Sequence, residues 1–147
     1  MQWTQPPTLT AVEEAILTFF DHLPVDTMQA LATVHVKPHA DSTPAATLDF
    51  HLRSLWEDLE DWLDDLDDLD DPSFDGDWQS RLTPLRSLPR ATVGWRVFSD
   101  DPQRMTDGDS ITATVHYQAE PTDCGARFEV LRTDAGYVLA LDSIRLG

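Results

Sequence analysis

Acidic side chains crowd one stretch of this chain, and their number and spacing are its clearest chemical feature. Residues 57 to 77 hold twelve Asp or Glu residues and no Lys or Arg, which leaves a net charge of only −5 for the other 126 residues of a chain whose total is −17. Carboxylates at this density attract cations and basic protein surfaces. The residues that we predict to bind a partner are Glu57, Asp58, Glu60, Asp61, Asp64, Asp65, Asp67, Asp68, Asp71, Asp75 and Asp77.

These carboxylates do not follow a known metal-binding pattern. The segment around Asp75 and Asp77 lacks the alternate ligand spacing and the closing Glu of an EF-hand. The histidines are too scattered for a zinc motif, and the single cysteine, Cys124, rules out a cysteine cluster. Phosphate-binding loops and dinucleotide glycine patterns are also missing from the sequence. We therefore expect no specific metal site and no cofactor, with loose binding of divalent cations left open.

His35 and Asp142 are the residues that could act as an acid and base pair. An imidazole titrates near neutral pH and can transfer protons. His35 stands between two valines on a predicted short strand, so its side chain points away from theirs, and Asp142 interrupts the last predicted strand. If both side chains point into a shared interior, they form a tentative catalytic couple; otherwise they have ordinary structural roles.

Composition and charge narrow the class of protein. A chain of 147 residues with 41% hydrophobic content is long enough for one domain with a substantial core. No apolar run approaches the length of a membrane span, and the first residues lack the basic start and apolar centre of a signal peptide. A net charge of −17 disfavours nucleic acid and anionic membranes as partners. We expect a cytoplasmic protein.

A long amphipathic helix, predicted over Ala45–Asp71, carries most of the acidic residues. Thr43 is suited to cap it, Pro44 to begin it and Pro72 to end it. Carboxylates three or four residues apart destabilise such a helix by about 0.2 to 0.5 kcal/mol per pair, and negative charge in the last turn by about 0.3 to 1 kcal/mol per group, so tertiary packing must hold it. The charged face is either simply solvated or a surface for a basic partner. The apolar stripe comprises Leu48, Leu52, Leu55, Leu59, Trp62, Leu66 and Leu69, widened by Trp56 and Leu63.

Shorter elements are predicted before and after this helix. Residues 1–9 read as an extended lead-in, capping boxes headed by Thr10 and Asp26 begin two helices, and residues 34–36 form a short strand. From Arg90 onward the apolar period falls to two. Segments 91–98, 110–120, 126–132 and 136–146 then predict an antiparallel meander with turns between them. The class is therefore α+β, with helices packed on one face of a curved antiparallel sheet.

Two local sequence patterns resemble those of a known group of proteins: FFDHLPVDTMQALATVHV at residues 19–36 and RFEVLRTDAGYVLALDSIRL at residues 127–146. They resemble the opening helices and strand, and the closing hairpin, of the nuclear transport factor 2-like superfamily, whose cystatin-like cone fold includes ketosteroid isomerase and the SnoaL-like polyketide cyclases. The resemblance implies a single cone-like domain over residues 10–147, an apolar pocket inside the cone and a homodimer through the outer sheet face. Where the isomerase has a tyrosine on its opening helix, this chain has Phe19 and Phe20. Neither side chain can donate a hydrogen bond, so this chain departs from the chemistry of the isomerase.

Two functions from different classes follow. In the first, the chain is a non-enzymatic interaction module whose acidic helix and following loop bind a basic surface on a nucleic-acid-binding protein or a toxin, as an immunity protein or nucleic-acid mimic does. In the alternative, it is a SnoaL-like or isomerase-like enzyme, or a binding protein, for a small apolar molecule, with His35 and Asp142 as acid and base. An enclosed pocket into which two ionisable side chains point would favour the alternative.

Overall fold

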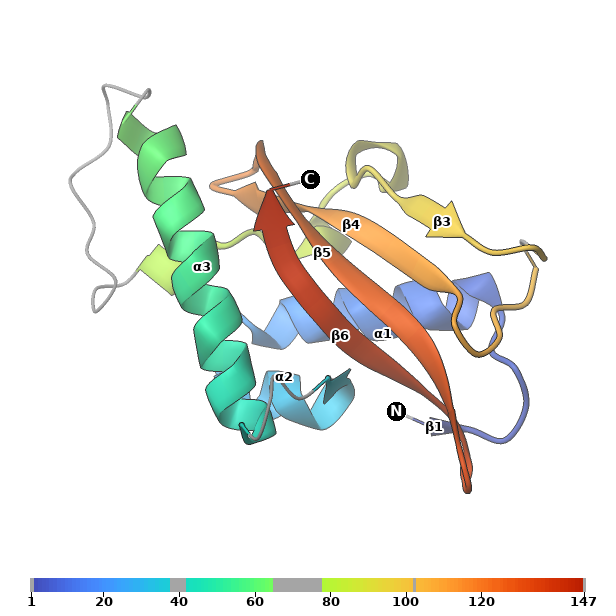
Figure 1. Cartoon of the computed structure of the whole chain (residues 1–147). Coiled ribbons are helices and arrows are strands. Elements are labelled where there is room, and N and C mark those ends of the chain that lie inside the picture. The colour runs from blue at the N-terminus through green and yellow to red at the C-terminus, as the bar shows by residue number, and fades with distance from the viewer. Residues whose placement is uncertain (1, 38–41, 65–77, 102, 147) are drawn as a thin grey trace.

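The computed structural model describes residues 2–37, 42–64, 78–101 and 103–146, with residues 61–64 and 146 described by their backbone. These residues form helices packed on a sheet, which confirms the α+β class (Figure 1). The helices are α1 (Leu9–His22), α2 (Thr27–Thr33) and α3 (Pro44–Asp64), and short 3-10 turns cover Trp78–Arg81, Leu85–Ser87 and Arg90–Thr92. The strands are β1 (Gln2–Trp3), β2 (His35–Val36), β3 (Arg96–Phe98), β4 (Ser110–Tyr117), β5 (Glu120–Thr133) and β6 (Gly136–Leu146).

The sheet has the order β1-β6-β5-β4-β3, and β2 also pairs with β6. All pairs are antiparallel except the parallel pair of β2 with β6, in which Val36 lies opposite Leu141. Trp3 lies opposite Tyr137, so residues 2–3 of the predicted extended lead-in form an edge strand paired with β6. The last strand thus ties both the start of the chain and the link before α3 into the sheet.

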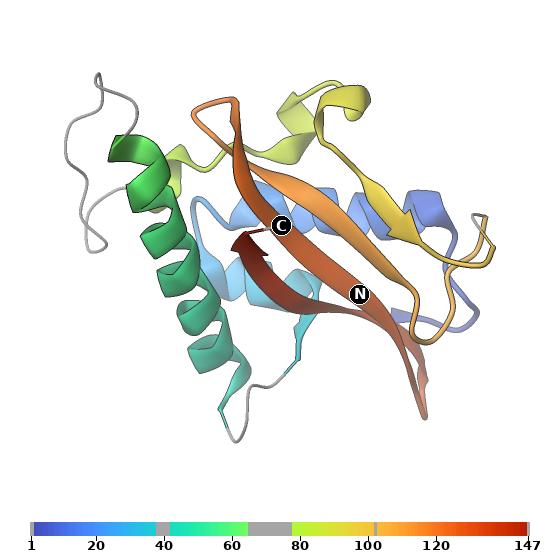
Figure 2. The same ribbon diagram turned by 45° about the horizontal axis from the view of Figure 1, so that its top comes forward.

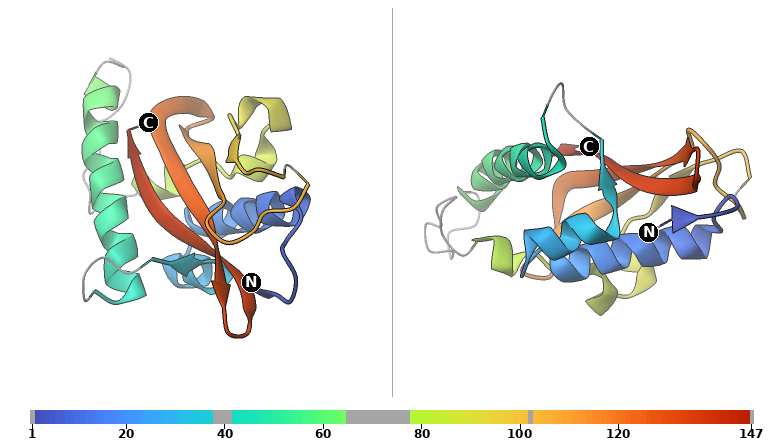
Figure 3. Two further views of the ribbon diagram at one scale, coloured as in Figure 1. Left: turned by 45° about the vertical axis from the view of Figure 1, so that its right-hand side comes forward. Right: turned by 90° about the horizontal axis from the view of Figure 1, so that it is seen from below.

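One face of the sheet, here called the inner face, packs on α1 (Figure 3). Phe19 and Phe20 of α1 are buried and meet Phe128 of β5 edge to face, with ring centroids 5.6 and 6.4 Å apart. Along β5, Ala126 and Val130 are fully buried beside Phe128, because every second side chain points to this face. The opposite face, the outer face, carries the alternate residues.

Helix α3 lies beside β6, where it contacts β6, β5 and β2 (Figures 1 and 2). The Thr43 hydroxyl accepts a hydrogen bond from the Ala46 amide at 3.2 Å and α3 begins at Pro44, which confirms the predicted start. The helix is described as far as Asp64, and the predicted continuation over residues 65–71 lies outside the described residues. The described leucines and Trp56 of the predicted stripe are buried: Leu48, Leu52, Leu55, Trp56 and Leu59.

Three local predictions differ from the structure. The cap of α1 is Thr8, whose hydroxyl accepts from the Ala11 amide, whereas Thr10 lies inside the helix. Residues 121–125, predicted as a turn, belong to β5, and the hairpin between β4 and β5 turns at Gln118 and Ala119, which both adopt positive φ. In segment 91–98 only the last three residues form a strand. Residues 121–125 extend β5 because they pair with β4 and β6, which overrides their local turn preference.

Candidate functional site

The carboxylates on the second half of α3 form the acidic surface: Glu57, Asp58 and Glu60 among the residues with described side chains. Burial of Leu55 and Leu59 against the sheet fixes how α3 is rotated, because residues four apart share a helix face. Glu57 and Glu60 are consequently exposed, and Asp58 is half-buried. The packing of α3 sets the direction in which these carboxylates point.

The remaining predicted partner-binding residues are placed less completely. Asp61 and Asp64 belong to the last turn of α3, where their backbone continues the same helix. No basic residue occurs between Arg53 and Arg81, so the sequence supplies no internal counterion along this stretch. Asp65, Asp67, Asp68, Asp71, Asp75 and Asp77 lie outside the described residues.

Asp58 lies at the border between α3 and the first part of β5. Its Oδ2 is 4.0 Å from the Cys124 Sγ, and the cysteine is buried. Burial, with the negative charge of Asp58 beside it, raises the pKa of the Cys124 thiol to about 11. The thiol is therefore protonated at neutral pH, and Asp58 is packed into the protein while Glu57 and Glu60 face solvent.

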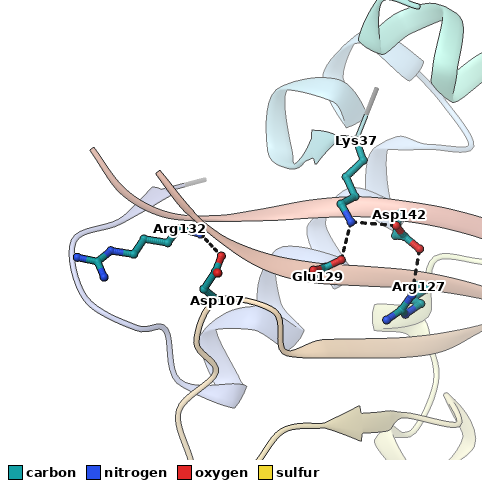
Figure 4. A network of polar contacts seen from close by, with 6 residues as sticks. All are labelled: Lys37, Asp107, Arg127, Glu129, Arg132 and Asp142. Carbon is teal, nitrogen blue, oxygen red and sulfur yellow. Dashed lines mark hydrogen bonds and ion pairs between the residues drawn. The ribbon is translucent and has the colours of Figure 1, made fainter. Parts of the chain in front are cut away.

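The structure places His35 and Asp142 on neighbouring strands with different surroundings. His35 is exposed and lies opposite Ala140, so it is not enclosed in an interior as the predicted couple requires. Asp142 accepts hydrogen bonds from Lys37 Nζ and Arg127 Nη1, each at 3.2 Å (Figure 4). Lys37 Nζ also lies 2.6 Å from Glu129 Oε2, and these contacts raise the pKa of Lys37. The described side-chain partners of Asp142 are thus the two cations Lys37 and Arg127.

Aromatic and aliphatic side chains fill the space between the inner face of the sheet and the helices that the structure describes. Phe19, Phe20 and Phe128 occupy the region over α1. Nearer α3, the rings of Trp56 and Trp78 pack with centroids 5.4 Å apart. Among the described residues, the buried polar or charged side chains include Glu13, which is 9% exposed and pairs with Arg90 at 2.5 Å, and the imidazoles of His51 and His116.

Two ion-pair groups were not anticipated from the sequence. One is the cluster of Lys37, Glu129, Asp142 and Arg127, and the other is Arg86, which binds Glu14 and Asp21 of α1 at 2.8 Å each. The contact with Arg86 lowers the pKa of Glu14. The only sequence signal was alternation along the strands, which gives a side chain's face but not its neighbour on another strand.

The described residues have neither a metal-binding group nor a membrane-spanning helix. They contain no group of three or more His, Cys, Asp or Glu residues placed to hold a metal ion. Among the same residues, none of the helices has both the length and the apolar character needed to cross a membrane.

Comparisons with protein-family models, with curated proteins and with solved structures gave no match to this chain.

Proposed function

We propose that the chain is a non-enzymatic interaction module whose acidic surface, together with the acidic residues that follow it up to Asp77, binds a basic surface on another protein. The observation that carries the proposal is the orientation of α3. Its apolar stripe is buried on the sheet, so Glu57 and Glu60 project from a fixed helix. A rigid row of carboxylates loses little conformational entropy on binding and attracts a cationic partner over a Debye length.

The energetics of the helix support the same proposal. Neighbouring carboxylates repel each other, and negative charge near a helix C-terminus opposes the helix dipole. A cationic partner relieves both costs, so part of the repulsion present in the free protein becomes a gain on binding. Nucleic-acid-binding proteins and nuclease toxins carry basic surfaces that could bind the acidic surface of this chain. The chain would then act as an immunity protein or nucleic-acid mimic.

We also propose that the fold is the cone of the nuclear transport factor 2-like superfamily. The support is the order of elements: two helices, a short strand, a long helix and then the meander from β3 to β6. A homodimer through the outer face of the sheet is part of this proposal, and size-exclusion chromatography with light scattering tests it.

The experiment for the partner uses two variants matched in charge. The test variant replaces Glu57→Gln, Glu60→Gln and Asp64→Asn on α3, and the control variant replaces Asp100→Asn, Glu120→Gln and Asp134→Asn at exposed positions elsewhere. Each immobilised protein is used to capture partners from its native cell at about 50 mM and about 500 mM salt, between which the Debye length falls to a few ångströms.

We expect wild type and control variant to retain the same basic protein at low salt, and the test variant to lose it. Loss of the partner at high salt would agree with an electrostatic interface. Equal capture by the two variants, or no capture by wild type at low salt, would show that the acidic surface is only solvated.

A further inference from the structure

The outer face of the sheet has a hollow of about 320 Å³ between the start of β3, the middle of β4 and the first half of β5. Its lining includes Arg96, Thr112, Thr114 and Asp123, and Gly94 and Gly125. Thr112 and Thr114 alternate along β4 with the buried Ile111 and Ala113, so the hollow opens away from the core. It therefore lies on the face of the sheet opposite α1.

The two glycines keep this hollow open. A Cβ added to Gly94, whose φ is +75°, would lie 2.5 Å from the Thr114 hydroxyl oxygen, and one added to Gly125 would lie 3.0 Å from a Thr112 methyl carbon. The Thr114 and Thr112 side chains therefore lie close against the backbone of Gly94 and Gly125, an approach that any larger residue would prevent.

Three arginines lie around the hollow on the same face. The strand register places Arg96 and Arg127 on either side of Thr112, and Arg145 opposite Gly125. Two strand spacings separate Arg96 from Arg127, or about 10 Å between Cα atoms, so both long side chains can reach a group seated over Thr112. Among the described residues, the side chains of Arg96 and Arg145 have no hydrogen bond or ion pair, whereas Arg127 also contacts Asp142.

We propose that this hollow binds the phosphate or carboxylate group of a small molecule. A guanidinium group donates paired hydrogen bonds to both kinds of oxyanion, and threonine hydroxyls add further donors. Three arginines lie around the hollow with Asp123 and Asp142, and Asp58 borders it through Cys124, which also lines the hollow and whose Sγ is 4.0 Å from Asp58 Oδ2. The hollow takes a ligand of the opposite charge to the partner proposed for the acidic surface, so the two proposals are tested independently.

The binding test titrates inorganic phosphate, pyrophosphate and citrate into the protein at constant ionic strength and follows backbone amide chemical shifts by NMR. We expect saturable shifts at Thr112, Thr114 and Gly125, and the comparison of pyrophosphate with citrate shows which oxyanion is preferred. No saturable shift in this group of amides up to about 10 mM of any probe, a concentration well above a millimolar dissociation constant, would overturn the proposal.

Charge variants of opposite sign test the arrangement itself. Arg96→Gln should weaken binding about tenfold, because a charge-assisted hydrogen bond is lost. Asp123→Asn should strengthen it, because a carboxylate is removed from the lining. Arg132→Gln is the control, since this residue is exposed on β5 and its guanidinium points away from the neighbouring charges in Figure 4.

All three residues are exposed at the surface, so the variants should fold, and thermal melts check this. The expected order of affinity is Asp123→Asn above wild type, wild type equal to Arg132→Gln, and Arg96→Gln weakest. Equal effects of Arg96→Gln and Arg132→Gln would show that only net charge matters, and weaker binding by Asp123→Asn would also contradict the proposed site.

Discussion

Lys37 follows β2 and connects that strand to two others through its ammonium group. It lies 2.6 Å from a Glu129 oxygen and 3.2 Å from an Asp142 oxygen, and its side chain is 34% exposed. The hydrogen bond to Glu129 is the main cause of the raised pKa of Lys37. A two-residue strand offers few backbone hydrogen bonds, so this ion pair is part of what holds the link before α3 against β6.

Lys37→Met should lower the free energy of unfolding by about 1 kcal/mol, a figure reduced for partial solvent exposure. The pKa of Lys37 is raised on folding, so its contribution is complete at neutral pH and is lost as pH rises above 10.5 through the folded pKa. Urea denaturation at pH 7 measures the loss. Arg53→Met, which breaks an exposed pair with Asp49, should cost less, and an equal cost would contradict a special role for Lys37.

Cys124 should react slowly with thiol reagents in the folded protein. Burial raises the pKa of its thiol to about 11, so little thiolate is present at pH 8. Reaction with a disulfide reagent, followed by absorbance, should be far slower in the native protein than in urea. Asp58→Asn should speed the native reaction modestly, because the neighbouring negative charge also raises this pKa. A native rate equal to the unfolded rate would contradict the described burial.

For single residues, the sequence predicts features that depend on neighbours along the chain. The caps Asp26 and Thr43 were predicted correctly, because a capping side chain bonds amides two or three residues away. The surroundings of His35 and Asp142 could not be predicted, since they depend on which strands pair and in what register. Helix periodicity predicts the exposure of Glu57 and Glu60, whereas Asp58, predicted on the same charged face, is half-buried.

Helix α3 depends on its buried stripe for stability, since its charged face works against it. Leu59 is fully buried beneath the acidic surface. Leu59→Ala should lower the free energy of unfolding by about 2 to 5 kcal/mol, and Leu59→Asp should abolish the cooperative transition by burying a charge. Phe50→Ala is a suitable control, because Phe50 is on the same helix and 51% exposed. Unchanged denaturation of both Leu59 variants would show that α3 does not pack as described.

The hairpin between β4 and β5 is strained by its residue types. Gln118 and Ala119 adopt φ values of 50° and 65°, where Asn and Gly are favoured. Replacing the pair with Asn-Gly should raise the free energy of unfolding by about 1 kcal/mol. Ala91→Gly, at an exposed residue without positive φ, should not stabilise the protein. Stabilisation by both changes would point to an effect other than the turn.

This hairpin also explains why strand boundaries were mispredicted. A tight turn formed by Gln and Ala carries no turn signal, whereas Pro121 and Gly125 carry one but lie within β5. Gly125 is accommodated there because Thr112 occupies the space of a side chain. The pairing of residues 2–3 with β6 was not predicted, because a two-residue strand leaves no period to detect.

For the whole molecule, the fold class was predictable because it follows from the order of helix and strand periods along the chain. The arrangement was not, because the parallel pairing of β2 and the ion pairs on the sheet join segments that are distant in sequence. The distribution of charge is likewise only partly predictable from the local sequence. Local sequence shows where acid accumulates, but only the fold places the arginines of β3, β5 and β6 on the outer face, away from α1.

Net charge should make the stability of the free protein depend on salt in a characteristic way. At −17, and with twelve carboxylates between residues 57 and 77, the folded chain repels itself, and added salt screens this repulsion. The melting temperature should therefore rise between about 50 and 500 mM sodium chloride. At low salt the variant with Glu57→Gln, Glu60→Gln and Asp64→Asn should melt about 3 °C above wild type, from about 1 kcal/mol of relieved repulsion.

The variant with Asp100→Asn, Glu120→Gln and Asp134→Asn separates a local effect from a global one, since it changes the net charge equally. Its three residues lie apart in the structure, each in a different loop or strand end, so it removes no closely spaced set of like charges. Calorimetry on the three proteins at both salt concentrations should give the largest salt dependence for wild type and the control, and the smallest for the α3 variant. If both variants gain the same stability at low salt, the repulsion belongs to the chain as a whole, and the strain that a basic partner would relieve at α3 is absent.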